Sequence, residues 1–159
     1  MSTPSLDFLA TVTSQRMANV IGKTVKNNKK VSSSDLENLV TKALGILQSQ
    51  GVYAMILFLF SRSGKEKEEI KMTPEERCAV EIISRLYTLK NPSETIKTFD
   101  PSNSKPEVEP TEINGNKNKF LREFADISKN LDTLLLVRDL YEQTLIYARF
   151  HAKAAKEGS

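Results

Sequence analysis

The stretch that decides the fold is LGILQSQGVYAMILFLFSR, residues 44–62. From Val52 to Phe60 it carries no charged residue, and apolar side chains occupy every side of a helical wheel. This pattern predicts a helix that is enclosed by other helices rather than one that lies on the surface. At about ten apolar residues the helix is too short to span a bilayer, which takes about twenty. Gln50-Gly51 interrupts the run and predicts a break between two helices.

The rest of the chain is also helical in pattern. Apolar residues recur at spacings of three and four, and no segment alternates with period two as a half-buried strand would. We therefore predict an all-α, single-domain bundle of about six helices over residues 1–159, with a long flexible loop at 100–116 before the C-terminal helices. Helices are expected at 5–26, 34–48, 52–62, 73–89 and 92–99, then from 117 onward with a break at 128–130 and a long last helix at 131–156.

Two of these helix starts carry capping signatures. Ser34 with Glu37, and Thr73 with Glu76, have the spacing of a capping box, in which the hydroxyl accepts from the backbone N–H three residues later. The carboxylate of the later residue accepts from the backbone N–H of the first. Pro74, at the first helical position, supports the second start.

Composition and charge limit the classes of function. With 39% hydrophobic and 27% charged residues, the chain is ordinary for a soluble globular domain. The formal net charge is +3, and Lys and Arg outnumber Asp and Glu toward both ends of the chain, which permits an anionic partner there. The single cysteine, Cys78, excludes an intramolecular disulfide, and the N-terminus lacks the pattern of a signal peptide. We therefore expect a cytoplasmic protein.

Few residues are suited to catalysis. The one histidine, His151, lies on the apolar side of the last helix without a second histidine or an acidic cluster at metal-ligand spacing, so we expect it to be packed and hydrogen-bonded. Cys78 has no candidate base, and a buried structural role is expected. No phosphate-binding glycine loop or zinc-protease motif occurs. We predict no enzymatic activity, no cofactor and no metal, and keep an enzyme based on His151 and Cys78 only as a third hypothesis.

The stronger functional signal is basic. Positive side chains recur on the first helix and the connector after it, and again on the last helix, where they are suited to neutralising backbone phosphates: Arg16, Lys23, Lys26, Lys29, Lys30, Arg149, Lys153 and Lys156. A solubilising surface is the alternative explanation. Aromatic residues cluster in apolar runs rather than among the lysines, so stacking on bases is not indicated.

Three short motifs carry a resemblance to a known family. They are Gln15-Arg16-Met17-Ala18, the apolar stretch 44–60 with its Gln50-Gly51 interruption, and Tyr141-Glu142-Gln143-Thr144 followed by Ala148-Arg149-Phe150. In this order they resemble the small α-helical subunit of the Cmr complex, the type III-B CRISPR–Cas RNA-targeting effector. The resemblance covers most of the chain apart from residues 100–116. Where the family usually has Asn before the glycine, this chain has Gln50.

The resemblance implies a non-catalytic subunit that stacks along the crRNA filament in antiviral defence. Its partners would be the backbone of crRNA or target RNA, other effector subunits and neighbouring copies of itself, with no membrane and no small-molecule substrate. Gln15, Arg16, Gln143, Thr144 and Arg149 match the family motifs and are the implied contacts with RNA or subunits. Two alternatives remain open: the small subunit of a type III-A or type I-A effector, and a helical protein–protein adaptor that binds no nucleic acid.

Overall fold

The computed structural model describes residues 5–157, except for the side chain of Glu157. Over this range the chain is all-helical, as predicted, and strands are absent apart from one isolated bridge between Thr24 and Lys30. The described residues form the α-helices α1 (Leu6–Ala18), α2 (Ser33–Gln50), α3 (Val52–Arg62), α4 (Pro74–Thr88), α5 (Pro92–Thr98), α6 (Lys117–Ala125) and α7 (Leu131–Glu157). Short 3-10 helices lie at η1 (Lys26–Asn28), η2 (Glu69–Lys71), η3 (Pro110–Gly115) and η4 (Asp126–Lys129). The predicted count of about six was slightly low, although α5 and α6 both lie where short helices were expected, at 92–99 and from 117 onward.

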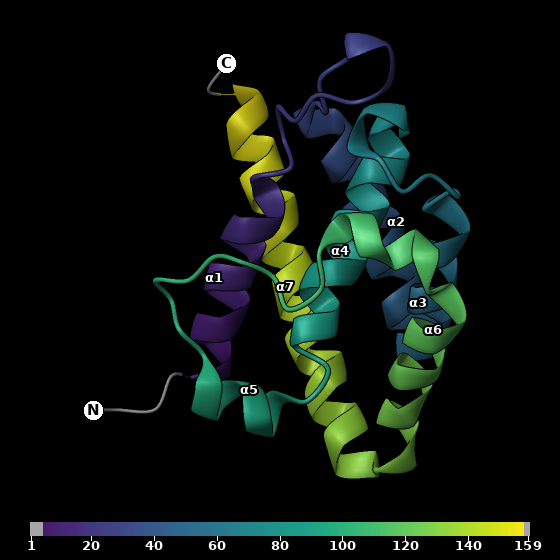
Figure 1. Ribbon diagram of the computed structural model, residues 1–159. Coiled ribbons are helices and arrows are strands. Elements are labelled where there is room, and N and C mark those ends of the chain that lie inside the picture. The colour runs from purple at the N-terminus through teal and green to yellow at the C-terminus, as the bar shows by residue number, and fades with distance from the viewer. Residues whose placement is uncertain (1–4, 158–159) are drawn as a thin grey trace.

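Helix α7 runs the length of the bundle and packs most extensively against α2 and α1. Figure 1 shows α1 beside α7, with α2, α3 and α6 on the other side of the molecule. The core is continuous across these helices and includes Leu9, Leu47, Leu59, Ile82 and Tyr141. No helix in residues 5–157 combines the length and the apolar character needed to cross a membrane.

Helix α3 is buried on one side only. Met55, Ile56 and Leu59 are fully buried, as expected, but Tyr53 and Leu57 are 39% and 45% exposed. The prediction that this helix is enclosed on every side was therefore wrong. The reason is that α2, α4 and α6 pack against α3 and leave its outer face uncovered.

Gly51 joins α2 to α3, as predicted. Its φ of 97° and ψ of −177° lie in a region that residues with a Cβ rarely adopt. The Gly51 N–H donates to the Leu47 carbonyl at 3.1 Å, and the Gly51 carbonyl accepts from Met55 N–H at 3.2 Å. One residue therefore ends one helix and begins the next.

The first helix is shorter than predicted. It ends at Ala18, not near residue 26, and residues 22–31 fold back as a hairpin. Gly22 N–H donates to Val31 O at 2.7 Å, and Val31 N–H donates to Lys23 O at 2.9 Å. We call residues 22–31 the lysine hairpin. Helical spacing of apolar residues continues beyond Ala18 in the sequence, but pairing with residues 29–31 replaces the helical hydrogen bonds.

The capping predictions had mixed outcomes. Thr73 and Glu76 form the predicted box, with Glu76 N–H donating to Thr73 Oγ1 at 3.1 Å and Thr73 N–H donating to Glu76 Oε1 at 2.8 Å. The box at the start of α2 is formed by Ser32 and Asp35, not by Ser34 and Glu37. Ser32 and Ser34 each have a carboxylate three residues later, and the earlier pair forms the box, so that α2 begins at Ser33.

The segment 100–116 is not a loop throughout. Residues 110–115 form η3, and Val108, Pro110 and Ile113 are buried. The Ser84 hydroxyl donates to Val108 O, and Asn114 Nδ2 donates to the carbonyls of Ser63 and Glu66 at 2.9 and 2.8 Å. These long-range contacts, rather than any local periodicity, attach the second half of the segment to α4 and to the end of α3.

Candidate nucleic-acid interface

The lysine hairpin displays four of the predicted contact residues at its surface. Lys23, Lys26, Lys29 and Lys30 are all exposed. Asn27 and Asn28 at the tip have φ angles of 62° and 59°, the left-handed conformation that Asn tolerates and that tight hairpin turns require. The turn therefore follows from the sequence Asn-Asn, and lysines flank it on both sides.

Buried valines and one backbone hydrogen bond attach the hairpin to the body of the protein. Val25 and Val31 are both 1% exposed, so their side chains form part of the core. Lys26 N–H donates to Met72 O, just before α4, at 2.9 Å. The lysine side chains thus project from a held backbone, which reduces the entropy lost when they bind an anion.

The C-terminal end of α7 lies at the same end of the molecule as the lysine hairpin (Figure 1). It carries Lys153, which is half-buried, and Lys156, which is exposed. We call this region the lysine end, defined as Lys23, Lys26, Lys29, Lys30, Lys153 and Lys156. The 3-10 helix η2 contacts η1, and Glu68, just before η2, has its Oε2 3.0 Å from Lys71 Nζ. All six side chains of the lysine end are positively charged, which favours an anionic partner.

Arg16 does not belong to the lysine end. Its Nη2 donates to the carbonyls of Asp100 and Pro101 at 3.2 and 3.0 Å, and its guanidinium lies 5.3 Å from the centroid of the Phe99 ring. Partial burial, with a further contribution from the charge of Arg85, lowers the pKa of Arg16, and Asp100 opposes this effect. Gln15, one residue earlier, is exposed on another face of α1.

The last-helix signature is mostly turned inward. Thr144 is fully buried and its hydroxyl donates to Leu140 O at 2.7 Å, so it has no surface to offer to RNA or to another subunit. Gln143 and Arg149 are half-buried, and the Nε of Arg149 is buried without a hydrogen-bond partner in the described part of the chain. These positions contribute to packing more than to an accessible surface.

The two residues considered for catalysis, Cys78 and His151, differ in burial. Cys78 is fully buried, as expected, and burial raises the pKa of its thiol to about 12. His151 is half-buried and lines a shallow depression with Gln15, Tyr147 and Phe150. Within residues 5–157, no three His, Cys, Asp or Glu side chains are grouped so that they could hold a metal ion.

Sequence reasoning missed a buried ladder of charges along α4. Arg77 Nε lies 2.6 Å from Glu69 Oε1, Arg77 Nη1 lies 3.0 Å from Glu81 Oε1, and Arg85 Nε lies 2.8 Å from Glu81 Oε2. Arg77 and Glu81 are only 5% and 4% exposed. The spacing of Arg77, Glu81 and Arg85 at successive intervals of four was the available signal.

Comparisons with known proteins give no relative for this chain: no protein-family model, no curated protein and no solved structure matches it.

Proposed function

We propose that this protein is a non-catalytic small subunit of a type III-B (Cmr) CRISPR–Cas ribonucleoprotein that holds target RNA by its phosphates through the lysine end. The observation that carries the proposal is that two lysine-bearing segments far apart in sequence, the lysine hairpin and the C-terminal end of α7, lie at the same end of the bundle (Figure 1). The short motifs that resemble the Cmr small subunit supply the biological setting, and the all-helical fold agrees with it. Small subunits of type III-A and type I-A effectors remain the nearest alternatives.

Lysines suit a role in which RNA is held without being read. An ammonium group meets phosphate oxygens as a point charge, and the resulting affinity depends on salt rather than on sequence. The lysine hairpin, residues 22–31, contains no aromatic residue on which a base could stack, although Phe150, 62% exposed, lies one turn from Lys153 on α7. A filament subunit that must accept any target sequence needs this kind of contact.

The residues that contact RNA phosphates differ in part from those expected from the sequence. Lys23, Lys26, Lys29 and Lys30 carry it, with Lys153 and Lys156 beside them. Arg16 is engaged by the loop after α5, and Thr144 is buried, so neither belongs to the proposed RNA surface.

The test is assembly with RNA. The chain should bind single-stranded RNA and crRNA–target RNA complexes of Cmr backbone subunits, and reversing the charges of Lys26 and Lys29 with Glu should weaken both. The matched control reverses Lys97 and Lys129, which are exposed on α5 and η4. Equal binding by both double variants would contradict an RNA contact at the lysine end, whatever the complex.

A protein–protein adaptor is the second candidate. Tyr53 and Leu57 lie one turn apart on α3 and are 39% and 45% exposed, forming a small apolar strip. An adaptor of this kind would bind no RNA even at low salt and would lose its protein partner on Leu57→Glu. Retention of RNA at low salt, lost with the lysine hairpin variants, would reject it.

A further inference from the structure

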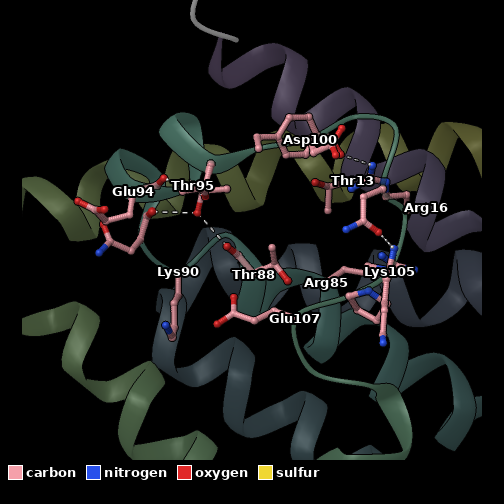
Figure 2. Close-up of a pocket in the computed structure, with 15 residues that line it drawn as sticks. Thr13, Arg16, Arg85, Thr88, Lys90, Glu94, Thr95, Asp100, Lys105 and Glu107 are labelled. Carbon is pink, nitrogen blue, oxygen red and sulfur yellow. Dashed lines mark hydrogen bonds between the residues drawn. The ribbon is translucent and has the colours of Figure 1, made fainter.

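A cleft of about 500 Å³ lies between α1, α4, α5 and the loop at 99–107. Figure 2 shows Arg16, Arg85 and Lys105 gathered on one side of it, with Lys90 and Glu94 on the other. The residues come from segments far apart in sequence, so no local sequence motif predicts the cleft. It lies away from the lysine end, and a ligand bound in it would be independent of the proposed RNA contact there.

Arg16 enters the cleft without a carboxylate partner. In the described part of the chain it makes no ion pair, and its guanidinium is met only by the Asp100 and Pro101 carbonyls and the face of the Phe99 ring. Its Nη2 makes both of these hydrogen bonds, which leaves Nε and Nη1 as donors. A partly buried guanidinium that makes no ion pair is costly, and the proximity of Arg85 adds to that cost, which the charge of the Asp100 carboxylate offsets only in part.

Arg85 supplies a second set of donors. Its Nε donates to Glu81 Oε2 at 2.8 Å and its Nη1 to Ser104 O at 3.0 Å, so the side chain is held from two directions and Nη2 remains as a donor. Two guanidinium groups, each held by hydrogen bonds to backbone carbonyls, therefore line the same cleft. This is the arrangement that binds a multivalent oxyanion.

Two of the three carboxylates that line the cleft, those of Asp100 and Glu94, have partners other than an arginine. Asp100 Oδ1 accepts from the N–H and the hydroxyl of Ser102 at 3.0 and 2.6 Å. Glu94 Oε1 lies 3.9 Å from Lys97 Nζ. Glu107 lies between the two sides of the cleft and contributes to the raised pKa of Tyr87, behind Tyr87's burial and its contact with Glu123. The Arg16 side thus keeps an excess of positive charge.

We infer that the Arg16–Arg85 side of this cleft binds a phosphate group, carried either by a small phosphorylated molecule or by a nucleic-acid strand. Phosphate fits better than carboxylate because its oxygens point in several directions and can accept from guanidinium groups on two different elements at once. Lys105 lines the same side of the cleft and adds a third positive group there. The cleft volume accommodates a group larger than phosphate alone.

The experiment is calorimetric titration of the full chain at low ionic strength with inorganic phosphate, uridine 5′-monophosphate, uridine and a short oligouridylate. Inorganic phosphate should bind saturably, and Arg16→Gln should weaken it by about tenfold or more, the effect of losing charge-assisted hydrogen bonds. Arg16→Lys should recover only part of the affinity, because it keeps the charge and loses the fork. Lys129→Gln, which removes the same charge from an exposed position on η4 outside both proposed sites, should leave phosphate binding unchanged.

The titrations with uridine 5′-monophosphate, uridine and oligouridylate distinguish a small phosphorylated ligand from a nucleic-acid strand. Arg16-dependent binding of the mononucleotide but not of uridine assigns a small phosphorylated ligand, and Arg16-dependent binding of the oligouridylate alone assigns a strand. The wild-type chain provides a check that needs no variant: phosphate should slow phenylglyoxal modification of Arg16 and Arg85 but not of exposed Arg122 on α6. Absence of saturable phosphate binding, or equal loss in Arg16→Gln and Lys129→Gln, would overturn the inference while leaving the lysine-end proposal untouched.

Discussion

Replacing Glu81 by Gln tests the buried charge ladder of α4. The substitution keeps the shape of the side chain and removes the negative charge that lies 3.0 Å from Arg77 Nη1 and 2.8 Å from Arg85 Nε. The side chains of Arg77, Arg85 and Glu81 are 6%, 14% and 5% exposed, so water cannot take over from the carboxylate. Breaking a buried pair by removing one partner costs about 3–5 kcal/mol, and Glu69 still neutralises part of the Arg77 charge. We therefore expect a loss of about 3 kcal/mol in the free energy of unfolding.

Urea denaturation followed by circular dichroism measures this loss. The midpoint should fall while the slope with denaturant stays constant, because the surface exposed on unfolding is unchanged. Glu68→Gln is the matched control: it removes the same charge from an exposed pair with Lys71 and should leave the midpoint in place. A Glu81→Gln midpoint close to that of the wild type would refute the reasoning, since it would mean that the two arginines do not depend on the carboxylate.

Three further substitutions or measurements test separate parts of the structure. Gly51→Ala should cost about 1–3 kcal/mol of stability by urea denaturation, from backbone strain alone, because a Cβ there meets no atom within 4 Å; an unchanged midpoint would contradict the φ of 97°. Burial raises the pKa of Cys78 from 9.0 to about 12, so the native thiol should resist a thiol reagent at neutral pH, and rapid labelling of the folded chain would contradict this. The contribution of the thiol to stability should be complete below pH 9.0 and should decline from there toward about pH 12, because the thiol of the unfolded chain ionises first. Thr144→Val should leave RNA affinity unchanged in a binding assay, because the hydroxyl is buried against Leu140 O, and a marked loss with the fold intact would restore Thr144 to the interface.

The parts of the fold that the sequence predicted well are those decided by neighbouring residues. The Thr73–Glu76 box and Pro74 start α4 as expected, and Gly51 breaks the apolar stretch because no other residue adopts its backbone conformation readily. The long last helix also ends and begins near its predicted bounds, since its apolar periodicity is sustained over many turns.

The parts that could not be predicted depend on distant contacts. The first helix stops at Ala18 because residues 22–31 pair with one another, and that pairing relies on burial of Val25 and Val31 beside Met72. Because residues 22–31 form a hairpin, Lys23 and Lys26 do not lie on the helical face that Arg16 occupies. The basic residues predicted on one face of the first helix are therefore divided between the lysine end and the cleft of Arg16 and Arg85. The cleft of Arg16 and Arg85 exists only because the loop after α5 crosses α1.

The most direct measurement of the role of the lysine end is the salt dependence of RNA binding. Log affinity for single-stranded RNA should fall linearly with log salt, and substituting Gln for Lys26, Lys29 and Lys30 together should reduce the slope by about 2, because each lost phosphate contact removes about 0.7. Substituting Gln for Lys97, Lys119 and Lys129, exposed on α5, α6 and η4, changes the net charge equally and should leave the slope unchanged. The same slope in the wild type and in both triple variants would contradict a phosphate contact at the lysine end.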